Sequence, residues 1–141
     1  MILVSMSSPT SSPLKVFVVE DSMLVRKRLA ERIQPPAGAG LIVGEAEDVE
    51  AALRGIAAKE PDVVIVDLRL TDSHGIDLLH ALRDRTDPIV TIVLTNYASD
   101  VFREASAAAG ADYFFDKTTE FDRAMETIAR LAQEKNEDAA G

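Results

Sequence analysis

The sequence predicts an α/β fold in which helices cover both faces of a parallel sheet. Five short runs rich in β-branched and aromatic residues alternate with five segments whose apolar residues recur at helical spacing. That alternation is typical of parallel strands joined by right-handed helical crossovers. The third run, residues 61–70 (PDVVIVDLRL), is apolar at consecutive positions until Asp67. A strand of this kind is buried on both faces, so we place it in the centre of the sheet.

Length and composition bound the possible functions. A chain of 141 residues suits one domain with a single core, and without cysteine it forms no disulfide. With only two histidines, a hard cation held by carboxylates is the metal site that remains open. The net charge of −9 argues against nucleic acid and anionic membranes as direct partners. We expect a flexible leader (1–13), one folded domain (14–133) and a polar tail (134–141) in a cytoplasmic protein.

Each element has its own sequence signal. The expected strands are residues 15–19, 41–46, 61–66, 89–94 and 112–115. The helices are marked by apolar residues at helical spacing, namely Val25, Leu29 and Ile33; Ala52 and Ile56; Ile76, Leu79 and Leu82; Phe102, Ala105 and Ala109; and Phe121 to Ala132. Pro35 stops the first helix, Asp48 caps the second, and Pro88 lies beyond the third. Gly110 ends the fourth, and Thr119 is placed as the cap of the fifth.

Polar residues follow four of the five strands. The carboxyl ends of parallel strands lie along one edge of the sheet, where open α/β sheets bind their ligands. That edge is predicted to collect Glu20 and Asp21, then Asp67, Thr95 and Lys117. The second strand contributes no charged group of this kind, which is expected of an outer strand.

These side chains are suited to phosphoryl chemistry. Clustered carboxylates repel one another unless they bind a cation, and an all-oxygen ligand set favours Mg²⁺. Lys117 supplies a positive charge and Thr95 a hydroxyl, the groups that neutralise and position a phosphoryl group. Asp67 is the best-placed nucleophile because it ends a central strand, and its product would be an acyl phosphate. The Glu20 and Asp21 pair is better suited to the metal.

Together these positions resemble the receiver domain of bacterial two-component response regulators. The resemblance rests on the acid pair Glu20 and Asp21, Asp67 with Gly75 eight residues later, Thr95, and Lys117. It covers residues 14 to about 133. It implies a flavodoxin-like, doubly wound, five-stranded parallel sheet of order 2-1-3-4-5 with five helices.

The resemblance also implies a function and a metal site. Asp67 would accept phosphate from the phosphohistidine of a sensor histidine kinase or a histidine phosphotransfer protein. Mg²⁺ would be bound by Asp21, Asp67 and the backbone carbonyl of Arg69, with Glu20 reaching it through water. Such a domain catalyses only its own phosphorylation and dephosphorylation and is not otherwise an enzyme.

The same resemblance assigns roles to Thr95, Lys117 and Phe114. Thr95 and Lys117 would contact the phosphoryl oxygens, and Thr95 would act with Phe114 as the conformational switch. Tyr113 is expected to point away from Phe114. Thr118 stands where proline usually follows the lysine, so we expect no cis peptide there.

Few residues follow the last helix, so we expect a receiver like the stand-alone chemotaxis regulators, with no DNA-binding domain, that acts by surface contact with a downstream protein target.

A small phosphatase of the haloacid dehalogenase type also uses an aspartate nucleophile, but it needs an acid two residues later, where Arg69 stands. A binding module that has lost phosphorylation is the other alternative, disfavoured because all the reactive positions are filled.

Overall fold

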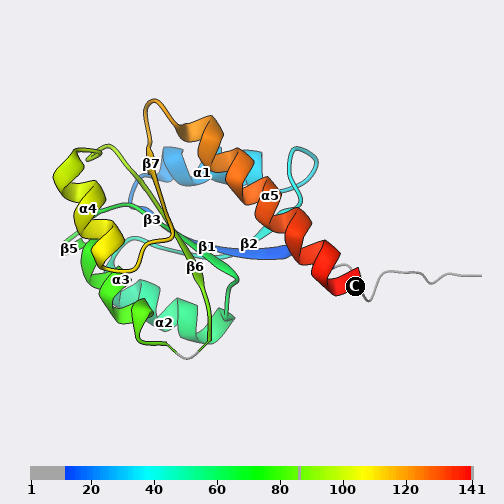
Figure 1. Cartoon of the computed structure of the whole chain (residues 1–141), viewed down its shortest axis with the longest axis horizontal. Helices are drawn as coiled ribbons and strands as arrows, with labels where there is room; N and C mark the ends of the chain where they lie inside the picture. Colours follow the sequence, from blue (N-terminus) through cyan, green and yellow to red (C-terminus); the bar gives the residue numbers. More distant parts are fainter. Residues whose placement is uncertain (1–11, 86, 141) are drawn as a thin grey trace, which may run out of the picture.

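The computed structural model describes residues 12–85 and 87–140, so most of the predicted leader lies outside the described residues. The chain forms one parallel sheet of order β2-β1-β3-β6-β7 (Figure 1). Its strands are β1 (Leu14–Val19), β2 (Gly40–Ala46), β3 (Val63–Val66), β6 (Val90–Thr95) and β7 (Tyr113–Asp116). Each strand begins and ends within two residues of its predicted bounds. The predicted order 2-1-3-4-5 is confirmed, since β6 and β7 are the fourth and fifth strands of this sheet.

A small hairpin separates β3 from the helix that follows it. Its strands β4 (Arg69–Leu70) and β5 (Ser73–His74) pair antiparallel, with Arg69 opposite His74. Asp72 takes a positive φ of 55° in the turn between them. The hairpin was not predicted, and it places Arg69 beside the carboxyl edge of the sheet.

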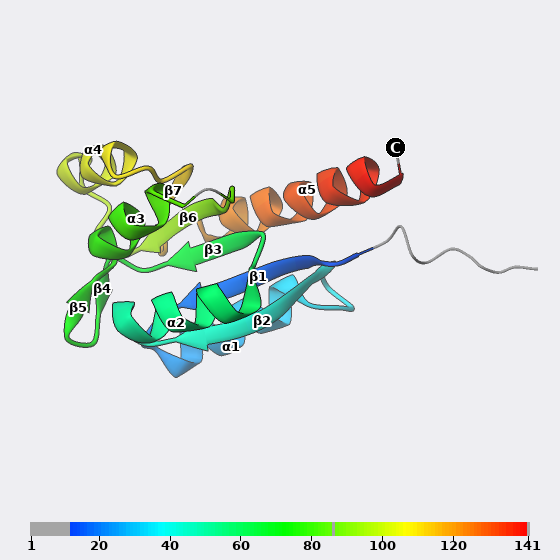
Figure 2. The same cartoon turned by 90° about the horizontal axis from the view of Figure 1, so that it is seen from below.

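Five helices cover the sheet in two layers (Figures 1 and 2). They are α1 (Met23–Ile33), α2 (Val49–Lys59), α3 (Gly75–Arg83), α4 (Asp100–Ala108) and α5 (Phe121–Ala140). Helices α1 and α5 lie on one face, and α2, α3 and α4 lie on the other. Within the described ranges, each helix is too short or too polar to cross a membrane.

The alternation of side chains along the strands builds two cores. Val16, Val18 and Ile65 face α1 and α5, where Leu29 and Ile128 pack. The intervening strand residues Phe17, Val64 and Val66 face the other way. They pack with residues of the second layer of helices, such as Ile56, Leu78 and Leu79. The central strand β3 is buried at each of its positions and is apolar throughout, as the sequence predicted.

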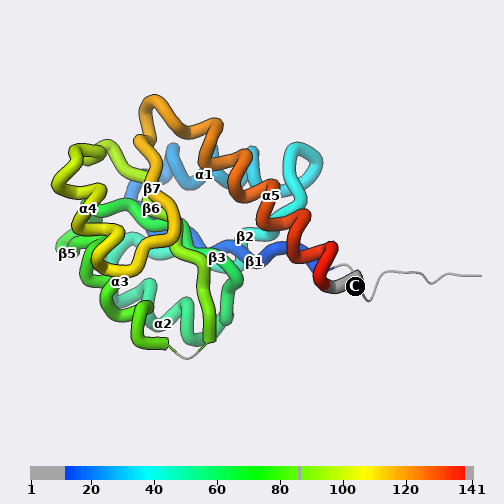
Figure 3. Tube along the Cα trace, viewed as in Figure 1, coloured from blue at the N-terminus to red at the C-terminus, as the bar shows by residue number. Residues whose placement is uncertain are grey.

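Most predicted helix ends are confirmed. Asp48 caps α2 by accepting a hydrogen bond from the N–H of Ala51 at 2.8 Å. Gly110, with a φ of 104°, follows the C-terminal end of α4 in the left-handed region that glycine tolerates best. The chain passes from α1 into β2 through residues 34–39 (Figure 3).

The two ends of α5 differ from the prediction. The helix begins at Phe121, and the carbonyl of Glu120 accepts its first intrahelical bond, so the placement of Thr119 as the cap is wrong. Asp116 Oδ1 accepts the N–H groups of Thr118 and Thr119 instead, which holds those residues in a turn.

The polar tail predicted from residue 134 is helical up to Ala140. Lys135 anchors the beginning of this extension. Its Nζ lies 2.7 Å from Asp62 Oδ2 and 3.0 Å from the carbonyl oxygen of Pro13. These contacts fasten the end of α5 to the starts of β1 and β3.

Candidate functional site

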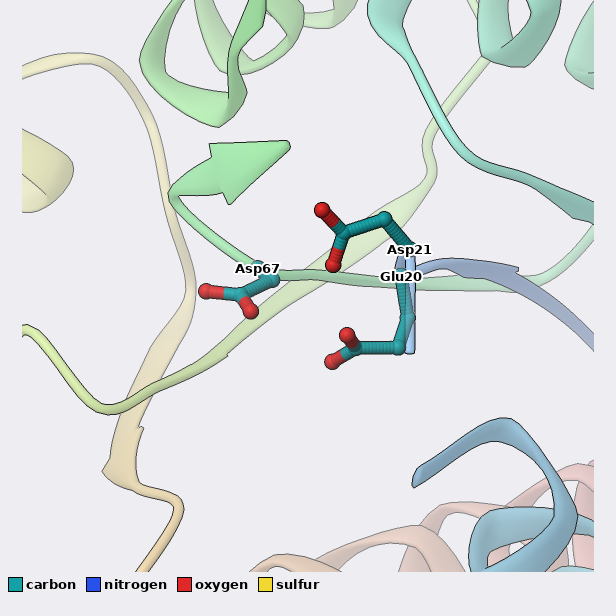
Figure 4. Close-up of side chains that lie close together, drawn as sticks. All are labelled: Glu20, Asp21 and Asp67. Atoms are coloured by element: carbon teal, nitrogen blue, oxygen red, sulfur yellow. The ribbon is translucent and has the colours of Figure 1, made fainter. Parts of the chain in front are cut away.

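The ends of β1 and β3 hold two acidic residues side by side. The N–H of Glu20 donates to the carbonyl of Ala46 at 2.9 Å, and the N–H of Asp67 donates to the carbonyl of Val19 at 3.0 Å. The hydrogen bonding of the sheet therefore continues one residue past each strand. The carboxylates of Glu20, Asp21 and Asp67 converge at this edge, as Figure 4 shows, and one oxygen from each lies within 4.8 Å of the others.

The three acids differ in their access to solvent. Glu20 and Asp67 are buried, whereas Asp21 is exposed. Glu20 Oε2 accepts the N–H of Ser22 at 2.9 Å, which turns the chain into α1. Asp21 Oδ2 is 3.4 Å from the hydroxyl of Thr71. Asp21 is thus the member of the cluster that a cation from solvent meets first.

Lys117 forms ion pairs with both buried acids. Its Nζ lies 2.7 Å from Glu20 Oε1 and 2.8 Å from Asp67 Oδ2. Burial raises the pKa of Glu20 above its ordinary value, and the hydrogen bond from Lys117 offsets only part of that rise. Burial alone would lower the pKa of Lys117, but its hydrogen bonds to Asp67 and Glu20, together with the attraction of their negative charges, outweigh this effect and raise the pKa. The ammonium group is therefore charged at neutral pH.

Thr95 fixes the other oxygen of Asp67. The fully buried hydroxyl donates to Asp67 Oδ1 at 2.8 Å and accepts the N–H of Tyr97 at 3.2 Å. The N–H of Arg69 lies 3.4 Å from the same Oδ1. The Asp67 carboxylate is therefore held in one orientation, between Thr95 on one oxygen and Lys117 on the other.

Backbone contacts place Lys117 at this edge. Its N–H donates to the carbonyl of Thr95 at 2.9 Å, which extends the pairing of β7 with β6. The Asp116 N–H donates to Glu120 Oε1 at 2.9 Å and secures the loop that follows. The one cis peptide in the described ranges joins Pro35 to Pro36, so the Lys117 to Thr118 peptide is not cis, as expected.

Tyr113 and Phe114, which are adjacent in β7, face opposite layers. Phe114 packs toward the core beneath α2 and α3, whereas Tyr113 packs on the α5 side and stacks on Phe115 with 6.2 Å between ring centroids. This confirms the expected opposite orientation. The guanidinium carbon of Arg103, in α4, lies 4.5 Å from the centroid of the Phe114 ring.

Two arginines make contacts around the site that the sequence did not predict, since Arg26 was not expected there and Arg69 was expected to contribute its backbone carbonyl. Arg26 Nη1 donates to the carbonyl of Glu20 at 2.7 Å, and the same guanidinium lies 3.5 Å from Glu45 and 3.8 Å from Glu47. The guanidinium of Arg69 stacks on Tyr97 at 4.6 Å from the ring centroid. Nothing in the spacing of the sequence pointed to these partners, because each pair is joined by a loop conformation or by the packing of a helix.

A comparison with known protein families matches residues 16–129 to the response regulator receiver domain. The chain belongs to this family. The match does not favour the alternative of a haloacid dehalogenase phosphatase, and the Arg69 side chain occupies the place where that chemistry needs an acid. The receiver domain thus carries Glu20, Asp21, Asp67, Thr95 and Lys117 together at one edge of its sheet.

Curated relatives are longer than this receiver domain. It is 35% identical over 103 residues to the DNA-binding transcriptional activator DevR/DosR of Mycobacterium tuberculosis. The matched segment is 73% of this chain and 47% of the relative. The domain is 33% identical over 118 residues to the transcriptional regulatory protein PhoP of Escherichia coli, which covers 84% of this chain and 52% of the relative. The chain therefore spans about half the length of the curated relatives that it matches.

Solved structures share the fold. The signal receiver domain of the putative response regulator NarL from Mycobacterium tuberculosis superimposes with a TM-score of 0.74 at 23% identity, over 89% of this chain and 97% of that one. The response regulator domain of Thermotoga maritima CheB gives a TM-score of 0.73 at 21% identity, over 89% and 98%. At these identities the likeness establishes the fold alone.

Proposed function

We propose that this receiver domain takes a phosphoryl group onto Asp67 from the phosphohistidine of a sensor histidine kinase or a histidine phosphotransfer protein. The observation that carries the proposal is the double anchoring of Asp67, with Thr95 on Oδ1 and Lys117 on Oδ2. A carboxylate held in this way presents its oxygens in a fixed direction toward an incoming phosphorus atom. Positioning of this kind supplies much of the catalysis of phosphoryl transfer.

The transfer exchanges one bond to phosphorus for another. An oxygen of Asp67 forms the new bond to phosphorus while the bond from phosphorus to the imidazole nitrogen breaks, and the electron pair stays on that nitrogen. Lys117 keeps its proton because its pKa is raised, so its positive charge remains to offset the charge of the phosphoryl oxygens. Dephosphorylation is attack by water on phosphorus, which releases phosphate and restores the carboxylate. The domain would catalyse these two reactions of its own side chain and no others.

The acidic cluster fits Mg²⁺. Its donors are all carboxylate oxygens, one from each acid within 4.8 Å of the others, and Asp21 faces solvent. Asp21, Asp67 and the backbone carbonyl of Arg69 would hold the ion. Glu20 would reach it through water, because Glu20 Oε1 is already paired with Lys117 at 2.7 Å. When bound, Mg²⁺ would offset the negative charge of the phosphoryl oxygens and of the acids themselves.

Output would pass through Thr95 and Phe114 to a downstream protein target. The Thr95 hydroxyl donates a hydrogen bond to Asp67 in the unphosphorylated domain, so a phosphoryl group on Asp67 offers the hydroxyl a new hydrogen-bond acceptor. Phe114 lies on the neighbouring strand β7, half-buried between the core and Arg103. A shift of Thr95 toward the phosphoryl group would change the space available to that ring.

Intact-mass measurement tests the phosphorylation. The whole chain is incubated with acetyl phosphate and Mg²⁺, and the same is done with Asp67→Ala and with Asp77→Ala, a matched control on the exposed side of α3. We expect one phosphoryl adduct on the wild type and on Asp77→Ala, and none on Asp67→Ala or on wild type stripped of divalent metal. A full adduct on Asp67→Ala or on the metal-free protein would overturn the assignment.

A further inference from the structure

Helix α4 is weakly anchored to the rest of the domain. Ser106 is its one buried residue, and its hydroxyl has no hydrogen-bond partner among the described residues. Val101 and Phe102, in the first turn, are 74% and 40% exposed. Burial of apolar side chains is what normally holds a helix to a sheet, and α4 has little of it.

Contacts made by arginines replace that missing burial. At the C-terminal end, Arg83 Nη1 donates to the carbonyl of Ala108 at 3.1 Å. In the middle, Arg103 Nη1 donates to the carbonyl of Phe114 at 3.3 Å, and its Nη2 lies 3.7 Å from Glu120 Oε1. These contacts attach the middle and the C-terminal end of α4 to the rest of the domain. The N-terminal end, nearest to Asp67, is held differently.

A stack of three side chains holds that N-terminal end. The guanidinium of Arg69 covers the Tyr97 ring at 4.6 Å, and Tyr97 meets the Phe102 ring edge-on with centroids 6.2 Å apart. We call Arg69, Tyr97 and Phe102 the arginine stack. With Leu68 and His74 it encloses a small cleft of about 120 Å³.

The arginine stack begins next to the carboxylate of Asp67. Arg69 is two residues from Asp67, and its N–H lies 3.4 Å from Oδ1. The N–H of Tyr97 donates to the Thr95 hydroxyl, which donates to the same Oδ1. Any new charge on Asp67 therefore arises close to Arg69, the exposed cation of the stack.

We propose that Arg69 responds to the charge on Asp67 and thereby couples phosphorylation to the attachment of α4. This regulation rests on the proposed phosphorylation. In the unphosphorylated domain the Arg69 guanidinium lies on Tyr97, where an exposed cation–π contact is weak. A phosphoryl group carries nearly two negative charges and offers bidentate acceptors that match the guanidinium fork. The Arg69 side chain turns toward the phosphoryl group and its contact with the Tyr97 ring is lost. The Tyr97 ring is then less well fixed against Phe102. The first turns of α4 are then released while Arg83 keeps the far end attached.

Hydrogen exchange of the α4 backbone tests this on the whole chain, with intact mass reporting the adduct in parallel. In wild type, acetyl phosphate with Mg²⁺ is expected to speed exchange in the first turns of α4 by roughly fivefold or more. In Arg69→Ala those amides are expected to exchange faster before any phosphodonor is added, and phosphorylation is expected to change them by less than about twofold. Arg69→Lys keeps the charge and should recover part of the response, whereas Arg54→Ala, on α2, should behave as wild type.

The outcomes separate the two proposals. A wild type that gains no adduct overturns the proposed function and, with it, the role of Arg69. A wild type that gains the adduct without faster exchange in α4 overturns the role of Arg69 alone. So does a phosphorylated Arg69→Ala protein that shows the full wild-type acceleration. Tyr97→Leu removes the ring and keeps the N–H that Thr95 receives, so a full acceleration in that variant contradicts the proposal even where Arg69→Ala takes up phosphate poorly.

Discussion

The ammonium nitrogen of Lys117 lies 2.8 Å from Asp67 Oδ2, although 50 residues separate the two in the sequence. A second contact, 2.7 Å to Glu20, makes this lysine the internal counterion of both buried acids. Without it, three carboxylates would share one edge of the sheet with no positive charge among them. Lys117 and a divalent cation therefore compensate the same negative charge.

Replacing Lys117 by alanine should not weaken Mg²⁺ binding. The affinity should rise several-fold, because a competing positive charge is removed from beside the cluster. Asp21→Ala should instead weaken binding by roughly tenfold or more, since it removes a ligand. Titration calorimetry on both variants measures the two effects, with Lys59→Ala, at the exposed end of α2, as the control. A loss in Lys117→Ala as severe as that in Asp21→Ala would mean that the lysine has been given the wrong role.

Thr95→Ala should keep the fold and Mg²⁺ binding while it uncouples phosphorylation from output. The hydroxyl is fully buried and links Asp67 to the N–H of Tyr97, so its loss should cost roughly 1–2 kcal/mol of stability. Thr95→Ser keeps the hydroxyl and should recover most of that loss. Chemical denaturation measures the stability, and the α4 exchange response measures the coupling. A phosphorylated Thr95→Ala protein with an unaltered response would exclude Thr95 from the switch.

The residues at the ends of the strands could be predicted from the sequence, because strand composition and the geometry of parallel sheets together fix where those ends meet. Glu20 and Asp67 belong to this class, and both lie where they were expected. The arginine stack could not be predicted. It depends on a hairpin of two residues per strand, too short to show periodicity, and on a positive φ at Asp72. The extension of α5 depends on Lys135 meeting Asp62, a contact between residues 73 positions apart.

Tyr97→Ala should lose its phosphoryl group faster than wild type, by a factor of several. The ring lies two residues after Thr95, beneath Arg69, and a bulky side chain there can keep water from approaching phosphorus in line. The rate of loss of the adduct by intact mass decides the matter. Tyr113→Phe, on the side of the sheet that α5 covers, is the control and should match wild type. An unchanged or slower rate in a folded Tyr97→Ala protein would exclude the shielding role.

Gly75→Ala should destabilise the domain and disturb the site. A Cβ at this position would overlap the backbone carbonyl of Asp67, and the N–H of Gly75 already donates to Leu68 at 2.8 Å, so neither segment can move away. We expect a loss of roughly 2 kcal/mol or more in the free energy of unfolding, as for other overpacked sites. Asp77→Ala, exposed on the same helix, should change it by less than about 0.5 kcal/mol. Equal stabilities for the two variants would show that the approach of α3 to Asp67 is not tight.

Locating the phosphoryl group tests the role of Asp67 most directly. Borohydride reduces an aspartyl phosphate to homoserine, so the phosphorylated domain is treated with borohydride, digested, and sequenced by mass spectrometry. We expect homoserine at position 67 in the peptide that contains β3, only when both acetyl phosphate and Mg²⁺ were present. Homoserine at position 21, or an intact aspartate at position 67 in protein that carries the adduct, would contradict this role.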